Sequence, residues 1–138
     1  MHRNPDRPMS PHLTVWKWGP HMLVSILHRI TGAGLAVVGG ILFTWWLTAA
    51  ATGPQAYADF LDLLTVESGA LNIAGYVLGI GLTWAFFQHT LSGLRHLVMD
   101  IGAGYELSAN KFWATATVAG ALLLTVALWA WILLGRGA

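Results

Sequence analysis

The stretch ITGAGLAVVGGILFTWWLTAAATGPQAYA, residues 30–58, contains no Asp, Glu, Lys or Arg. Two more windows, residues 68–94 and 112–135, also lack these four residue types. Each window can hold the roughly 20 apolar residues that cross a hydrocarbon core of about 30 Å. We therefore predict an all-α integral membrane protein, a bundle of three transmembrane helices near residues 24–50, 71–98 and 112–134.

The composition indicates that lipid is the solvent for most of the chain. Hydrophobic residues make up 56% of the 138 residues and charged residues only 9%, whereas soluble domains carry about 25% charged residues. Eight tryptophans suit membrane interfaces. The chain has no cysteine, which excludes disulfides, thiolate metal sites and iron–sulfur ligation within it. A net charge of +1 argues against a nucleic-acid partner.

Basic residues are distributed unevenly about the predicted spans. The first connecting loop is acidic, with Asp59, Asp62 and Glu67, and Arg136 alone follows the last span. The other basic residues lie on the opposite side: Arg3, Arg7, Lys17, Arg29, Arg95 and Lys111. The positive-inside rule places the N-terminus in the cytoplasm and the C-terminus on the outer, periplasmic side. Residues 1–23 then form a cytoplasmic N-terminal segment, in which RPMSPHLTVW at 7–16 is predicted to be extended, and residues 24–134 form a single transmembrane domain.

The second span contains one deep ionisable side chain, His89, and such residues are costly inside a membrane and usually functional. At 100° per residue, four positions fall within about 60° of one another and form one polar stripe. They are His89, Gly93, His96 and Asp100. Gly93 removes side-chain bulk one turn beyond His89, so a flat macrocycle or a close helix could use that gap. Two interpretations stay open, an axial ligand of haem iron and a structural hydrogen bond between helices.

A haem with two histidine ligands needs a second histidine at the depth of His89, and the sequence has none. The other histidines precede the first span or lie nearer the interface: His2, His12, His21, His28 and His96. The haem interpretation therefore requires another chain, or a second copy of this one, to supply the other ligand.

The start of the first span has a matching polar feature. Ser25 and Arg29 are four residues apart on one helical face, which continues inward through small residues: Gly32, Ala36 and Gly39 or Gly40. Small residues let helices approach closely in a bilayer, so we expect this face to point into the bundle. A hydroxyl donor and a fixed cation at the membrane edge, under Trp18 and Met22, suit a quinone, whose oxygens become negative during reduction. Alternatively, Arg29 snorkels to lipid phosphates and Ser25 caps the helix.

Three stretches together resemble the cytochrome b subunit of succinate dehydrogenase, respiratory complex II: RPMSPHLTVW at residues 7–16, SILHRITG at 25–32 and HTLSGLRHLVMD at 89–100. The resemblance covers the N-terminal lead and all three spans. It implies that His89 is the axial ligand of haem b iron and that Ser25 and Arg29 bind ubiquinone. It also implies quinone-lining positions, which are Trp18, Met22 and Ile26, and haem-propionate or proton-relay positions, which are His28, Arg95 and His96. Asp100 would orient His96.

The same resemblance implies the rest of an assembly. The chain would be the membrane anchor and electron-transfer subunit of succinate:quinone oxidoreductase, in the tricarboxylic acid cycle and aerobic respiratory chain, with no activity alone. Its partners would be a second small anchor subunit giving the other haem ligand, an iron–sulfur subunit, a flavoprotein with FAD, and the lipid of a bacterial inner membrane, which the chain crosses several times. Two alternatives are a self-contained membrane b-type cytochrome and a non-enzymatic membrane scaffold.

Overall fold

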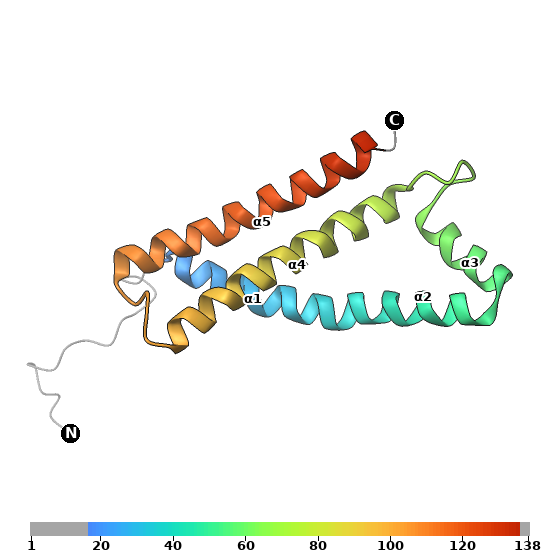
Figure 1. Cartoon of the computed structure of the whole chain (residues 1–138). Coiled ribbons are helices and arrows are strands. Elements are labelled where there is room, and N and C mark those ends of the chain that lie inside the picture. The colour runs from blue at the N-terminus through green and yellow to red at the C-terminus, as the bar shows by residue number, and fades with distance from the viewer. Residues whose placement is uncertain (1–16, 136–138) are drawn as a thin grey trace, which may run out of the picture.

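The computed structural model describes residues 17–135, and every regular element in this part of the chain is a helix (Figure 1). The elements are α1 (Pro20–Gly34), the π-helical segment η1 (Leu35–Gly39), α2 (Gly40–Thr52), α3 (Pro54–Leu64), α4 (Ile73–Asp100) and α5 (Leu107–Gly135). The predicted all-helical architecture is confirmed. The predicted extended N-terminal chain, together with Arg3, Arg7 and Arg136, lies outside the described residues.

The first three elements form one continuous helix of 33 residues, Pro20–Thr52. Pro20 lies in the first turn, where its missing N–H costs no hydrogen bond. Gly53 ends the helix with a φ of 135°, a conformation that other residues rarely adopt, and Pro54 then begins α3. The predicted span at 24–50 lies inside this longer helix.

The π-helical turn at η1 changes which small residues face the bundle. Gly32 and Gly39 face α4, because a Cβ atom on either would meet a side chain of that helix. Ala36 and Gly40 instead line a groove on the outside of η1 and α2. The prediction that Ala36 points inward with Gly32 is therefore wrong, because a π turn holds more residues than an α turn and shifts the facing positions.

Helix α4 contacts both α1 and α5, and α1 also contacts α5, so the three helices pack together (Figure 1). The buried residues on these three helices are mostly small or carry hydroxyl groups: Val24, Thr31, Gly75, Ala85, Gln88, Ser92, Ala114, Thr117, Ala121 and Thr125. The hydroxyls of Ser92, Thr117 and Thr125 each donate to the carbonyl four residues earlier. Such residues let helix backbones approach closely without leaving a hydroxyl unpaired, as is typical of helices packed in lipid.

A short helix, α3, lies where we expected only a connecting loop between the first two spans. Phe60 is buried on its inner face and packs edge-on against Trp45 of α2, with ring centroids 5.3 Å apart. Asn72 then caps α4, because its Oδ1 accepts a 2.9 Å hydrogen bond from the Gly75 N–H. Its amide also donates to the Leu63 carbonyl at 2.9 Å, which ties the end of α3 to the start of α4.

Two helices in the described part of the chain are long and apolar enough to cross a membrane, Pro20–Thr52 and Leu107–Gly135, with mean hydropathies of 1.7 and 2.2. Large apolar side chains cover their outer faces, and Leu123 and Val126 are 70% and 66% exposed. Helix α4, of 28 residues, is not one of these two helices. That α4 also spans the membrane, and that the N-terminus is cytoplasmic, stay predictions.

Candidate functional site

Three histidines from two helices meet at the interface of α1 and α4. The ring of His28 stacks on the ring of His89, with centroids 4.0 Å apart and planes 7° from parallel. The ring of His96 lies 4.8 Å from that of His28 and is tilted by 56°. The sequence placed these side chains at one end of the bundle, and the structure brings them into contact. We call His28, His89 and His96 the histidine cluster.

Hydrogen bonds determine which nitrogen of His89 carries the proton. Nδ1 lies 3.1 Å from the His28 carbonyl oxygen and 3.4 Å from Thr31 Oγ1. The carbonyl can only accept, and the Thr31 hydroxyl already donates to the Leu27 carbonyl at 2.7 Å. The proton of the neutral imidazole therefore lies on Nδ1. The lone pair of Nε2, the atom that a metal ion coordinates, is left free of any hydrogen bond within residues 17–135.

The same reasoning applies to His28. Its Nδ1 lies 2.7 Å from Ser92 Oγ, and Ser92 donates its own proton to the Gln88 carbonyl at 2.6 Å. Ser92 therefore accepts from His28 Nδ1, and His28 is also held as the Nδ1-protonated form. Neither Ser92 nor Thr31 was predicted as a site residue. Ser92 follows His89 by three residues, and Thr31 follows His28 by three residues, each inside a quoted motif. This spacing, which puts neighbours on one helical face, was the available signal.

A glycine makes room for the His89 ring. A Cβ atom on Gly32 would lie 2.7 Å from His89 Cε1 and 3.2 Å from Nδ1, so a larger residue cannot fit without moving the ring or the helix. At Gly93 a Cβ would meet only His28 Cε1, at an ordinary 3.7 Å. The small residue that the cluster requires is therefore Gly32 rather than Gly93.

Gly32→Ala is expected to lower the free energy of unfolding by about 1–3 kcal/mol, the usual cost of overpacking a close contact. The measurement is a denaturant titration of the purified protein in detergent. Gly34→Ala is the matched control, because nothing lies within 4 Å of a Cβ at that position of the same helix. Equal stability of the two variants would mean that the Gly32 contact with His89 is not a packing constraint.

The two predicted quinone donors, Ser25 and Arg29, lie on α1 within one turn of His28. Ser25 is half-buried and Arg29 is exposed, and within residues 17–135 neither side chain makes a hydrogen bond or an ion pair. Ser25 does not cap the helix, because Gly19 is the N-cap residue of α1. The neighbouring quinone-lining candidates are half-buried or exposed: Trp18, Met22 and Ile26. The Ser25 hydroxyl and the Arg29 guanidinium are thus donors without an acceptor in the described chain.

The structure separates Arg95 from the histidine cluster. Its Nη2 donates a 2.8 Å hydrogen bond to Asn110 Oδ1, and it lines a cleft between α4 and α5 rather than the α1 interface. The expected hydrogen bond between Asp100 and His96 is not formed. Asp100 is exposed, and His96 Nδ1 is buried with no partner in the described chain.

Residues 3–128 match the family model described as the succinate dehydrogenase/fumarate reductase transmembrane subunit. The chain belongs to this family. The succinate dehydrogenase cytochrome b556 subunit of Paracoccus denitrificans is 39% identical over 121 residues, which cover 88% of each chain. The subunit of the same name from Rickettsia felis is 32% identical over 123 residues, which cover 89% of this chain and 90% of that one.

A mitochondrial relative is also similar. The succinate dehydrogenase cytochrome b560 subunit of Mus musculus is 34% identical over 119 residues, which cover 86% of this chain and 67% of that one. As a transmembrane subunit of the succinate dehydrogenase/fumarate reductase family, the chain is a membrane component of an oxidoreductase complex. The exposed apolar side chains of the bundle are accounted for by lipid and by other subunits.

Proposed function

We propose that this subunit anchors a succinate:quinone oxidoreductase in the membrane and carries electrons to quinone, with His89 as an axial ligand of haem b. The observation that carries the proposal is the 3.1 Å hydrogen bond between His89 Nδ1 and the His28 carbonyl. It orients the ring and leaves the Nε2 lone pair for iron, as second-shell acceptors do at metal sites. The names of the similar proteins, cytochrome b556 and cytochrome b560, support a haem.

The histidine cluster fits one axial ligand and not two. The rings of His28 and His89 are stacked face to face, with their centroids 4.0 Å apart. Two histidines this close together could not bind one haem from its two opposite faces. The second ligand would come from the second small anchor subunit. His96, whose Nδ1 has no partner in the described chain, would donate to a haem propionate at the edge of the cluster, and His28 would lie beside it with its own N–H given to Ser92. When bound, haem b supplies a one-electron carrier whose potential depends on its axial ligands and surroundings.

The proposed quinone site is formed by the flank of α1. Ser25 donates a hydrogen bond to one quinone carbonyl, and Arg29 stabilises the negative charge that grows on the oxygen during reduction. Trp18, Met22 and Ile26 provide the apolar walls. Support comes from the free donors of Ser25 and Arg29, because most other hydroxyls on these helices donate back to their own helix. The partner subunits would complete the pocket.

The proposed topology has three spans, with α4 as the second. At about 1.5 Å per residue, its 28 residues reach about 42 Å, which exceeds a hydrocarbon core of about 30 Å. Its most buried polar side chains, Gln88 and Ser92, are shielded from lipid by the bundle, each with 0% exposure. We place the N-terminus on the cytoplasmic side of a bacterial inner membrane. The iron–sulfur subunit and the FAD flavoprotein would dock on that side.

The experiment that tests this proposal is purification of the tagged subunit from membranes in a mild detergent. We expect three partners in equal amounts, a flavoprotein, an iron–sulfur protein and a second small membrane subunit, together with a b-type absorption spectrum. A haem-bearing single chain would instead establish a self-contained cytochrome. A colourless chain without soluble partners would establish a membrane scaffold.

A further inference from the structure

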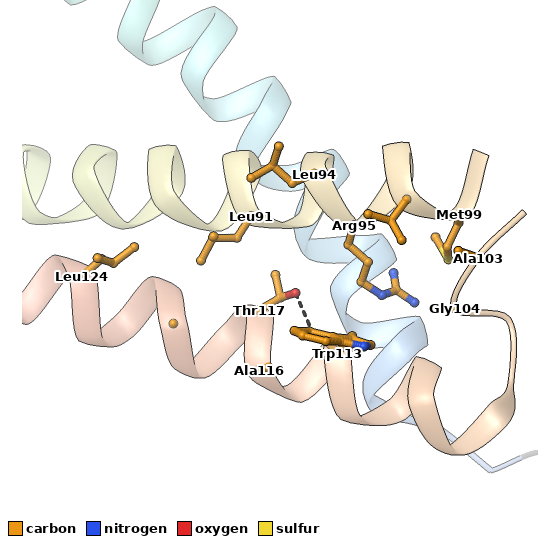
Figure 2. Close-up of a pocket in the computed structure, with 12 residues that line it drawn as sticks. Leu91, Leu94, Arg95, Met99, Ala103, Gly104, Trp113, Ala116, Thr117 and Leu124 are labelled. Carbon is orange, nitrogen blue, oxygen red and sulfur yellow. Dashed lines mark hydrogen bonds between the residues drawn. The ribbon is translucent and has the colours of Figure 1, made fainter. Parts of the chain in front are cut away.

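A cleft between α4 and α5 is lined by residues of these two helices and of the loop that joins them (Figure 2). Its volume is about 570 Å³, within the range of small-molecule sites. The walls are almost entirely apolar, with Leu91 and Val98 on one side and Ala116 and Gly120 on the other. Neither the histidine cluster nor Ser25 and Arg29 line this cleft, so it is a separate feature of the subunit.

One end of the cleft carries a positive charge. Figure 2 shows Arg95 reaching from α4 toward α5, beside the ring of Trp113. Its guanidinium is held by Asn110, whose own amide donates to the Gly104 carbonyl at 3.4 Å. Within residues 17–135, Arg95 has no carboxylate partner. A charge on a helix near the membrane needs a counter-charge, and the planar guanidinium fork fits a phosphate group.

The other end of the cleft is apolar. A Cβ atom on Gly120 would lie only 3.1 Å from Leu91 Cδ1, so α4 and α5 are in close contact there. Leu124 continues the apolar lining beyond this point. A ligand of this cleft therefore has one anionic head and one apolar tail. A quinone ring fits less well, because it is neutral and has a carbonyl at each end.

We propose that this cleft binds an anionic phospholipid, with the headgroup phosphate on Arg95 and an acyl chain along Leu91, Ala116 and Gly120. Arg95 lies five residues before the end of α4 at Asp100, about 7.5 Å along the helix axis. This places it where phosphates meet the hydrocarbon core. Trp113 beside it suits the same depth, because tryptophan favours the membrane interface. The lipid would fill the space between the two helices and neutralise the guanidinium.

The test is native mass spectrometry of the purified complex, titrated in detergent with phosphatidylglycerol or with phosphatidylcholine. We expect tighter binding of phosphatidylglycerol, and a loss of about 10- to 100-fold in its affinity in Arg95→Gln, the usual effect of one charged hydrogen bond. Ala116→Leu keeps the charge but fills the cleft, so it should weaken both lipids. Lys111→Gln is the control, because it removes one positive charge nearby from an exposed residue that does not line the cleft.

Several outcomes would overturn the proposal. Unchanged phosphatidylglycerol binding in Arg95→Gln and Ala116→Leu would mean that the lipid binds elsewhere. Displacement of the lipid by a short-chain ubiquinone analogue would identify the cleft as a quinone site. An altered haem spectrum in Arg95→Gln with normal lipid binding would assign Arg95 to the haem. If Arg95→Gln does not assemble, the result for Ala116→Leu decides, because that variant adds only apolar bulk.

Discussion

Replacing His89 with alanine is expected to remove the b-type absorption of the purified complex. The variant deletes the nitrogen proposed to coordinate the iron, Nε2 of His89, whose lone pair is left free because Nδ1 donates to the His28 carbonyl. A haem that keeps a single axial histidine, from the partner anchor, is held weakly and changes its spectrum. The measurement is haem content per complex, from the pyridine haemochrome and the reduced-minus-oxidised spectrum.

A matched control for this prediction is His21→Ala. His21 lies on α1 but outside the histidine cluster, so its loss removes a histidine without removing the proposed ligand. We expect normal haem content in that variant. Full haem content with an unchanged spectrum in His89→Ala would show that the haem is ligated elsewhere, and His89 would then be a structural hydrogen-bond donor to α1.

Removing either proposed quinone donor is expected to slow quinone reduction strongly. Ser25→Ala and Arg29→Leu each delete a group aimed at developing negative charge, and the loss of one such donor typically lowers kcat by about 100- to 1,000-fold. Haem content and assembly should be unaffected, because neither side chain contacts another described residue through a hydrogen bond. The measurement is succinate-dependent reduction of a ubiquinone analogue by the purified complex.

Two controls separate the quinone site from upstream steps. Succinate oxidation with a soluble dye that accepts electrons before the membrane subunits should stay normal in both variants. Ser68→Ala removes an exposed hydroxyl from the turn between α3 and α4 and should leave quinone reduction unchanged. Normal quinone kinetics in Ser25→Ala and Arg29→Leu would leave Arg29 as a lipid-facing interfacial cation, which was the alternative interpretation of this residue.

Part of the candidate site could be predicted from helical periodicity alone. His89 and His96 share one face of α4 because they are seven residues apart, close to two turns. His28 was expected at the same end of the bundle as these two histidines. The first two spans are antiparallel, so the start of the first span lies at the same membrane face as the end of the second. Periodicity cannot predict the π turn at η1, which rotates Ala36 away from α4. Nor does it predict α3, whose one buried side chain, Phe60, packs on Trp45.

The sequence by itself determined that this protein is helical and membrane-bound, because long windows without charge are stable only where lipid or protein surrounds them. It also determined which residue types were available for chemistry. Only the tertiary structure decided which of them meet. Gly32 admits the His89 ring, Ser92 accepts from His28, and Arg95 turns toward α5 instead of joining the histidine cluster. Those contacts depend on the distance and rotation between packed helices, which no single helix encodes.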